Sequence, residues 1–385
     1  MMPGRPVAIA GVGYSTIGRH SGLSTQDLVI ESTLAALEDA GLEARDVDGI
    51  TTLGSEAISD AWMLGIGPLR WWNTALAAPA FVYAAHQAIT AIASGFCDTV
   101  VALRIIQQQP TGKKLLGGRG EGHPMTAQLS RAAGDQQFLL PFGAGAPPQW
   151  AGLLTQRHML QFGTTAEQFG HHVITQRYHA SHNEDAFFRE PLTMDEYLAS
   201  RYVSKPLRLL DCDYPCDSGS AVVFTTAERA RDTRKPPVIV EAASLTAIRD
   251  LCFELLDDMA ETSPTPCAEE LWSRTDLGPD DVSTAHLYDG FSVITFHWLE
   301  ALGFCGRGEA GPFVEEGNTR LGGRLPVNTD GGACNVGRRH GANFCIEAVR
   351  QLRGECGSRQ VQDAAVSVFT NSTGPFCGAV LLRKD

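Results

Sequence analysis

The same order of predicted strands and helices occurs twice along the chain. In the first half, an apolar strand at 7–12 is followed by a helix at 25–40 and by a strand that begins after Gly49. In the second half, a strand at 237–240 is followed by a helix containing 268–273 and by a strand around 285–287. Each half then ends in a glycine-containing turn that leads into an apolar strand, at 218–224 and at 374–382. A repeat of about 180 residues is too long for a solenoid unit and indicates a duplicated domain.

Strands that alternate with helices predict an α/β fold with mostly parallel sheets that helices cover. We expect a first half at 1–235 and a second half at 236–385, with a long insert in the first half at about 105–205. The insert contains glycine-rich loops at 107–122 and 138–148 and predicted helices at 151–162 and 166–181. Long inserts on a rigid scaffold commonly line binding clefts, so we expect this segment to border a ligand site.

Composition argues against some classes of function. The chain has 385 residues, of which 43% are hydrophobic and 19% are charged, as in ordinary globular enzymes. Its 44 acidic and 31 basic residues give a formal charge of −13, which argues against a nucleic-acid-binding protein. We find no apolar stretch long enough for a membrane span or a signal peptide, so we expect a cytoplasmic protein. The ten cysteines are scattered, and we expect free thiols and no metal site.

Five groups of short motifs, taken in order, resemble a known family. They are A-G-L at 40–42 with D-V-D-G at 46–49, L-D-C-D at 210–213 with D-S-G-S-A at 217–221, L-Y-D-G-F-S at 287–292, N-T-D-G-G at 328–332 and G-R-R-H-G-A at 337–342. Over nearly its full length the chain resembles the thiolase superfamily. The closest branch is that of the lipid-transfer proteins, which includes sterol-carrier-protein thiolases and cysteine-less steroid side-chain aldolases. The resemblance implies duplicated α-β-α-β-α layers with an inserted loop domain, and a homodimer assembled through the central sheets.

One departure from the thiolase pattern bears on the chemistry. In thiolases the nucleophilic cysteine opens a buried helix that leads, through a glycine and an aspartate, to a core strand. The matching segment here is A-A-P-A, and counting back from Gly95 and Asp98 places the nucleophile position at Ala78. Ser372 stands at the second cysteine position, and Cys377 is interpreted as a core thiol. Without a thiolate no acyl-enzyme can form, so Ala78 is expected to border a bound acyl-CoA without reacting with it.

The Y-D-G-F turn at 288–291 follows a predicted strand and occupies the place of a thiolase motif that helps to bind the thioester oxygen. A phenol can donate a proton, or accept one if its surroundings lower its pKa. The resemblance implies that Tyr288 takes part in proton transfer, and that Asp289 orients it or belongs to a surrounding network. The alternative is a tyrosine packed at the end of the strand, with its hydroxyl on the backbone.

The G-R-R-H-G-A turn at 337–342 resembles the G-H-P-x-G-A turn of thiolases, but Arg338 occupies the histidine position and His340 falls two residues later. Two alternatives follow. Either His340 points into the site as an acid or base, or Arg338 faces an oxyanion and His340 only caps the next helix. Gly341 permits close approach of the backbone, and the start of a helix offers N–H donors to a developing enolate.

Three further residues complete the predicted site. Asn328 either hydrogen-bonds the thioester or simply belongs to a turn. Gly374 offers a backbone donor near the second thiolase cysteine position. His86 lies in a predicted buried helix and either contacts the ligand or is an ordinary core residue. The sequence leaves open whether Tyr288 or His340 is the base.

The resemblance implies a retro-aldolase, a carbon–carbon lyase that cleaves a β-hydroxyacyl-CoA of a sterol or bile-acid side chain. The products would be a ketone or aldehyde and acetyl-CoA or propionyl-CoA, with no cofactor beyond the coenzyme A of the substrate. A small zinc-ribbon/OB-fold partner protein is implied as well. Trp62, Trp71 and Trp72 either form an exposed interface for it or belong to the core. The alternatives are a thiolase-like acyl-CoA condensing enzyme and a non-catalytic lipid or acyl-CoA carrier.

Overall fold

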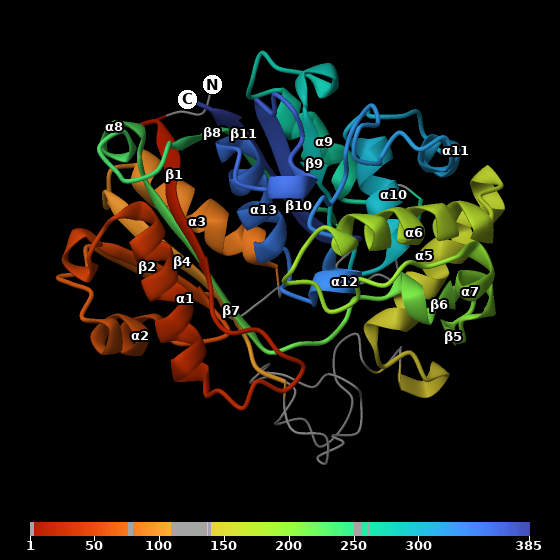
Figure 1. Cartoon of the computed structure of the whole chain (residues 1–385), viewed down its shortest axis with the longest axis horizontal. Coiled ribbons are helices and arrows are strands. Elements are labelled where there is room, and N and C mark those ends of the chain that lie inside the picture. The colour runs from red at the N-terminus through yellow and green to blue at the C-terminus, as the bar shows by residue number, and fades with distance from the viewer. Residues whose placement is uncertain are drawn as a thin grey trace.

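Nine strands form one continuous sheet in the computed structural model of the chain (Figure 1). The structure describes residues 4–75, 80–108, 137, 140–249, 256, 258–260 and 262–385. From one edge to the other the strands are β3 (Trp71–Ala75), β2 (Gly49–Leu53), β4 (Thr99–Ile106), β7 (Ser218–Thr226), β1 (Val7–Tyr14), β8 (Val238–Ala247), β11 (Phe376–Lys384), β10 (Val366–Thr373) and β9 (Thr284–His286). A separate short ribbon pairs β5 (Tyr202–Ser204) with β6 (Leu207–Arg208).

The strand order repeats between the two halves. In the first half, β1 is antiparallel to β7, β7 is antiparallel to β4, and β4 is parallel to β2. In the second half, β8, β11, β10 and β9 follow one another with the same directions. The halves join where β1 pairs with β8, through Ala8 opposite Ile239 and Ile9 opposite Val238. This repeated order confirms the repeat predicted from the sequence.

The expectation of mostly parallel sheets is wrong. Of the eight pairings between the described strands of this sheet, five are antiparallel. The cause is the last strand of each half. A tight turn after Thr373 sends β10 back into β11 as a hairpin, and β7 returns from the insert to lie between β4 and β1. Only strands joined by helix-containing crossovers are parallel, as is usual for such connections.

Helices divide the molecule into five layers (Figure 1). On one side, α1 (Thr25–Ala40) and α2 (Ala57–Leu64) cover the first-half strands. In the middle, α3 (Phe81–Ala93) and α13 (Ala342–Arg353) contact strands of both halves. On the other side, α9 (Pro264–Trp272) and α10 (Ser292–Ala301) cover the second-half strands. The order α-β-α-β-α is the predicted one.

Side chains of one strand alternate between neighbouring layers, which defines the cores. In β11, Val380 and Leu382 belong to the core around α3 and α13, whereas Ala379 and Leu381 belong to the core around α9 and α10. Alternation of this kind is what a strand covered by helices on both faces requires. The two central helices are therefore enclosed by sheet on both sides, and the segments that lead into them are held in place by the whole fold.

The insert places further helices beside this arrangement. It contains α5 (Pro147–Phe162), α6 (Ala166–Ser181) and α7 (Met194–Ala199), and the first two confirm the predicted helices. Helix α6 contacts α10, α11 (Ala310–Glu315) and α12 (Ala333–Val336), so the insert borders the motifs between 288 and 342. The short α8 (Ala227–Ala230) ends the first half. Among the helices that the structure describes, none is both long and apolar enough to cross a membrane.

Candidate active site

The two central helices begin beside each other. At the start of α3, the Phe81 N–H donates to the carbonyl oxygen of His340 at 2.9 Å, and the Val82 N–H donates to Asn371 Oδ1 at 3.3 Å. The start of α13 lies against the same asparagine, because a Cβ added to Gly341 would lie 2.2 Å from Asn371 Oδ1. Gly341 also has a φ of 87°, which disfavours any other residue. The predicted nucleophile position, Ala78, lies just outside the described residues.

Tyr288 follows β9 and is held against glycine. Its N–H donates to Thr370 Oγ1 at 3.1 Å, and its ring meets Phe344 edge-on. A Cβ added to Gly290 would lie 2.8 Å from the ring and 2.9 Å from the hydroxyl of Tyr288, so the ring folds back over a position that must be glycine. Burial and the carboxylate of Asp213 raise the pKa of Tyr288, and the charges of Arg338 and Arg104 act in the opposite direction.

Asp289 does not orient the phenol. Its Oδ1 accepts the Ala333 N–H at 3.0 Å, and its Oδ2 lies so close to Gly332 that a Cβ there would be 2.1 Å away. Burial raises its pKa well above the usual value. The carboxyl therefore connects the Tyr288 turn to the start of α12. Of the two predicted roles for Asp289, the structure favours membership of the surrounding network.

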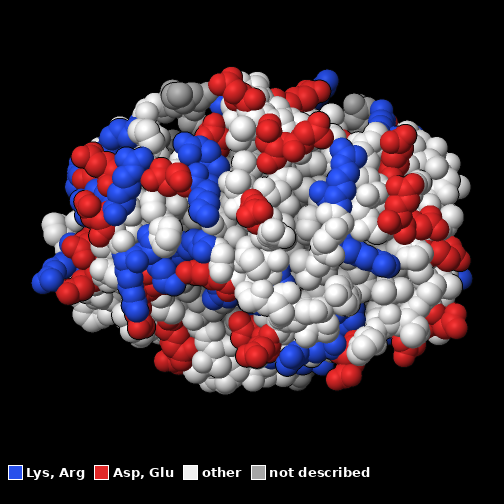
Figure 2. Space-filling model, turned by 45° about the horizontal axis from the view of Figure 1, so that its top comes forward, with Lys and Arg blue, Asp and Glu red and all other residues white. Residues whose placement is uncertain are grey.

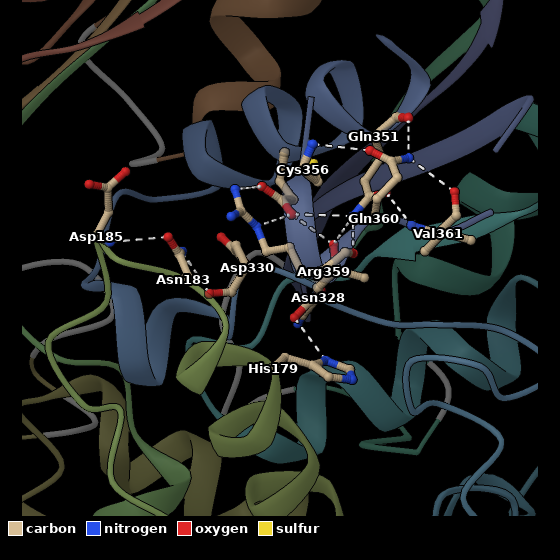
Figure 3. Close-up of polar contacts among 12 residues, drawn as sticks. His179, Asn183, Asp185, Asn328, Asp330, Gln351, Cys356, Arg359, Gln360 and Val361 are labelled. Carbon is tan, nitrogen blue, oxygen red and sulfur yellow. Dashed lines mark hydrogen bonds and ion pairs between the residues drawn. The ribbon is translucent and has the colours of Figure 1, made fainter. Parts of the chain in front are cut away.

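Asn328 supports the strand that leads into Tyr288. Its Oδ1 accepts the Leu287 N–H at 2.7 Å, and its Nδ2 donates to the Leu287 carbonyl at 2.8 Å, much as a neighbouring strand would. Figure 3 shows His179 of α6 reaching the backbone of Asn328, at 3.3 Å from the carbonyl oxygen. The Asn328 side chain is fully buried and its φ is 51°. This geometry does not support the expected contact with a thioester and instead makes Asn328 a positioning residue.

A buried polar network fixes the rest of the 328–332 segment (Figure 3). Thr329 donates to Glu347 at 2.8 Å, and Glu347 forms an ion pair with Arg359 at 2.9 Å in which both side chains are largely buried. Asn343 donates to Asp330 Oδ2 at 3.0 Å. Removing one partner from a buried ion pair commonly costs about 3–5 kcal/mol, so this network holds the segment firmly.

His340 and Arg338 point into the region around Tyr288. Nδ1 of His340 contacts Nη2 of Arg104, which lies on β4. Nε of Arg338 lies 3.5 Å from Asp213 Oδ1. The cap of α13 is Gly341 and uses no side-chain hydrogen bond, so His340 does not cap that helix. Burial, Arg104 and Arg338 together hold the pKa of His340 well below its usual value. The Asp213 N–H donates to the Gly290 carbonyl at 3.1 Å and its carboxylate pairs with Arg338, so the turns of Tyr288 and His340 are joined in one cluster.

Gly374 and His86 lie less directly on this cluster. Gly374 has a φ of 74° in the β10–β11 turn, and its carbonyl accepts the Ser263 N–H at 2.9 Å. His86 on α3 contacts Thr90 Oγ1 at 3.4 Å, and burial together with Arg274 lowers its pKa to about 4. No described contact joins either residue to the tyrosine cluster. Cys377 is fully buried on β11, as expected of a core thiol.

Arg104 and Asp213 were missed as site residues when the sequence was considered alone. Arg104 is the one charge in the otherwise apolar strand 99–106, and a buried charge of that kind usually has a specific partner. Asp213 belongs to the L-D-C-D motif, where its carboxylate gave no sign of facing Arg338. Arg339, the neighbour of Arg338 in the G-R-R-H-G-A turn, is 2% exposed and lies over the Tyr14 ring.

Comparisons with known proteins point to the same family throughout the chain. Residues 252–382 match the thiolase C-terminal domain-like family. A steroid side-chain-cleaving aldolase from Thermomonospora curvata is 36% identical, with 100% of this chain and 99% of that protein covered. The 17-hydroxy-3-oxo-4-pregnene-20-carboxyl-CoA lyase of Mycobacterium tuberculosis is also 36% identical, with 97% and 98% covered. The solved structure of an Ltp2-ChsH2(DUF35) aldolase superposes with a TM-score of 0.89 at 34% identity, and covers 100% of this chain and 98% of that one.

Proposed function

This chain belongs to the thiolase family, and from that premise we propose that it is a retro-aldolase, a carbon–carbon lyase that acts on a CoA thioester. The proposed substrate is the CoA thioester of a steroid side chain with a hydroxyl on its β-carbon, like the 17-hydroxy acid named for the Mycobacterium tuberculosis relative. Cleavage between the α- and β-carbons of that acid gives a steroid 17-ketone and propionyl-CoA.

The reaction makes three demands on the site. A base must take the proton of the β-hydroxyl, the electrons of the broken carbon–carbon bond must enter a thioester enolate, and an acid must protonate the α-carbon. Tyr288 supplies a phenol for proton transfer. Arg338 and Arg104 lower the cost of a phenolate there and of a nearby enolate. The starts of α3 and α13 meet beside this cluster, where the Phe81 and Val82 N–H groups are already bound to the His340 carbonyl and to Asn371.

One arrangement carries the proposal: the turns of Tyr288 and His340 meet in a partly buried cluster, joined by the Asp213–Arg338 pair at 3.5 Å, with Arg104 in contact with His340. Two described thiols lie beside these turns: Cys216 donates to the Arg338 carbonyl at 3.7 Å, and Cys334 donates to the Asp289 carbonyl at 3.5 Å. Burial raises the pKa of Cys216 to about 11 and that of Cys334 well above its usual value. A thiol of that kind stays protonated at neutral pH and is a poor nucleophile. Proton transfer therefore suits this cluster better than cysteine-based acyl transfer.

A second subunit is part of the proposal. The similar solved structure is named as a pair, Ltp2 with ChsH2(DUF35), and we propose a small zinc-ribbon/OB-fold partner for this chain as well as a homodimer. Trp62 is 85% exposed and Trp72 is 54% exposed, so these two side chains are available to a partner, whereas Trp71 packs against the central core. On the face drawn in Figure 2, basic side chains are interspersed with acidic ones.

The test is to incubate the protein, with any subunit that co-purifies, with 17-hydroxy-3-oxo-4-pregnene-20-carboxyl-CoA and to follow products by mass spectrometry. The steroid 17-ketone and propionyl-CoA are expected in equal amounts. Thiolysis of acetoacetyl-CoA would instead indicate an acyl-CoA condensing enzyme. Intact steroid substrate, bound tightly in calorimetry with the subunit present, would indicate a lipid or acyl-CoA carrier.

A further inference from the structure

We propose that Arg104 holds His340 as the neutral tautomer that carries its proton on Nε2, so that His340 donates a hydrogen bond in the active site and does not act as the base. The inference rests on the proposed function for its catalytic meaning. Its structural part, the tautomer, can be tested without any reaction.

Arg104 is built into the fold. It lies on β4, is 7% exposed, and its Nη1 donates to the carbonyl oxygens of Leu53 and Ile105. A Cβ added to Gly54 would lie 2.8 Å from Nη1 and 2.1 Å from the Ile105 carbonyl, so the guanidinium passes a position that only glycine fits. These contacts direct the other terminal nitrogen, Nη2, toward Nδ1 of His340. The guanidinium therefore has a defined orientation toward the imidazole.

The imidazole is held as firmly. His340 has a φ of 46°, and its carbonyl oxygen accepts the N–H of Phe81 at the start of α3 at 2.9 Å. The next residue, Gly341, begins α13. The backbone of His340 thus connects the two central helices, which fixes the position from which its ring meets Arg104.

The chemistry of the two groups fixes the proton. A guanidinium has only N–H donors, accepts no hydrogen bond and stays protonated in proteins. Its contact with Nδ1 therefore requires a lone pair on Nδ1. A neutral imidazole with a lone pair on Nδ1 carries its hydrogen on Nε2. Protonating Nδ1 would place an N–H against the arginine and a second positive charge beside it.

The surrounding charges act in the same direction. Among the described residues, the charged groups that act on the ring are Arg104 from β4 and Arg338 from the turn of His340 itself, and both disfavour the imidazolium. Asp213 offsets Arg338 through their ion pair at 3.5 Å but does not face the ring in any described contact. His340 is therefore a poor proton acceptor at either nitrogen. The raised pKa of Tyr288 keeps its phenol protonated, so Tyr288 suits the acid that protonates the α-carbon, and the Nε2–H of His340 can donate to the thioester oxygen as the enolate forms.

The first experiment measures the tautomer directly in the wild-type protein. Histidine labelled with ¹⁵N gives long-range ¹H–¹⁵N spectra that distinguish a protonated ring nitrogen from an unprotonated one, and the His340→Gln variant identifies the signals of His340. We expect a protonated Nε2 and an unprotonated Nδ1, without change between pH 8 and about 5.5, well below the ordinary histidine pKa of about 6.5. A proton on Nδ1, or titration of the ring within that pH range, would overturn the proposal, and this outcome does not depend on which reaction the enzyme catalyses.

Variants then test the roles of the two side chains. In Arg104→Met, His340 should titrate closer to its ordinary pKa, and kcat should fall by about tenfold or more with little change in KM. Arg104→Lys should restore part of the loss. Arg353→Met is the matched control, because Arg353 is another buried arginine and lies at the far end of α13, where it pairs with Asp39 at 2.7 Å. This variant should leave the His340 signals unchanged.

The His340 variants separate a donor from a base. Glutamine places an amide N–H near the position of Nε2 but cannot accept a proton at neutral pH. His340→Gln should therefore keep about tenfold more turnover than His340→Ala. Equal loss in both variants, with the fold intact by circular dichroism, would identify His340 as the base. Loss of the steroid activity in the wild type, with the expected tautomer, would count against the proposed function only.

Discussion

At the scale of single residues, the position of Tyr288 depends on the residue beneath it. Its ring lies over Gly290, its N–H is bound to Thr370, and the strand before it is held by Asn328. These contacts fix the position of the phenol ring, close to Arg338 and Arg104. Two predictions follow from this geometry, one for the phenol itself and one for the glycine.

Replacing Tyr288 by Phe removes the proton-transfer group and leaves the ring. We expect kcat for the steroid thioester to fall by about 10²-fold or more, with KM changed little. Steady-state kinetics of the assembled enzyme measures both constants. Tyr197→Phe is the control: its hydroxyl donates to the buried Asp211 at 2.9 Å, so it should cost stability of about 1–3 kcal/mol but leave kcat unchanged. Unimpaired turnover in Tyr288→Phe would remove Tyr288 from the mechanism.

Replacing Gly290 by Ala keeps the phenol and displaces it. The added Cβ would lie 2.8 Å from the ring, so the ring must shift, and a shift of about 1 Å at a reacting group can cost on the order of 10²-fold in rate. We expect a loss of kcat close to that of Tyr288→Phe. Gly278→Ala is the matched control, since nothing lies within 4 Å of its added Cβ and its φ of −133° suits any residue. Equal turnover in both alanine variants would mean that the phenol position does not matter.

The sequence was sufficient to single out the turns of Tyr288, Arg338 and His340, because each lies in a motif that opens a helix or follows a strand, but it left open which of Tyr288 and His340 is the base. It was not sufficient for Asn328 and Asp289. An amide or carboxylate beside glycines is compatible with a ligand contact and with a backbone contact alike. Only the register of the strand before Tyr288, and the closeness of Gly332, decide that both side chains bind backbone N–H groups.

At the scale of elements, α6 packs its buried face against α10 and α12 and borders the site from the insert. That face carries His172, which is 2% exposed and meets Phe296 of α10 edge-on. Burial, with a smaller contribution from His179, lowers the pKa of His172 to about 3. The helix is thus packed around an imidazole that must stay neutral.

Stability should therefore depend on pH through His172. The folded state binds this proton only near pH 3, whereas the unfolded chain binds it below about 6.5, so stability is complete above 6.5 and is lost as the pH falls. Relative to His172→Leu, the wild type should lose up to about 1.4 kcal/mol per pH unit below 6.5. Urea unfolding at several pH values between 7.5 and 5 measures this. Phe169→Leu, also on the buried face of α6, should give a difference from the wild type that is the same at every pH.

The strand directions were the part of the fold that periodicity could not give. An apolar strand after a helix predicts a crossover connection and a parallel pairing, and β2, β4 and β9 do pair in parallel with a neighbouring strand. The strand after Ser372-Thr373-Gly374 instead returns directly as a hairpin, which this turn sequence permits but does not require, and β7 returns antiparallel from the insert. The layers themselves were predictable, because apolar residues on successive positions of β4 and β11 require cover on both faces.

At the scale of the whole molecule, the edge strand β3 and the helix α2 that contacts it present the exposed Trp72 and Trp62. Alternation along β3 turns Trp71 toward the central core and Trp72 toward the other face, where α2 lies. Two large aromatic side chains on neighbouring surface elements are typical of a protein interface. The proposed second subunit is the occupant we assign to them.

Replacing both tryptophans should separate the subunits without unfolding the chain. In the double variant Trp62→Ser and Trp72→Ser, the affinity for the co-purified subunit should fall by about 30-fold or more, the loss typical of an interface hot spot, while the melting temperature stays nearly constant. Titration calorimetry measures the affinity. Leu160→Ser, at a 75% exposed apolar side chain on α5, is the control. Unchanged subunit affinity with a dissociated homodimer would assign the surface to a second copy of the chain instead.

The position of the cluster between α3 and α13 has a consequence for how such a protein can change its chemistry. The two helices occupy the same layer, and each begins in a segment that belongs to a different copy of the repeated half. One copy can lose a reactive side chain ahead of its helix while the other keeps its glycines and cations. Substitutions in one half can thus replace one reaction by another while the strands and helices of the scaffold stay the same. The catalysed reaction and the fold can therefore change independently of each other.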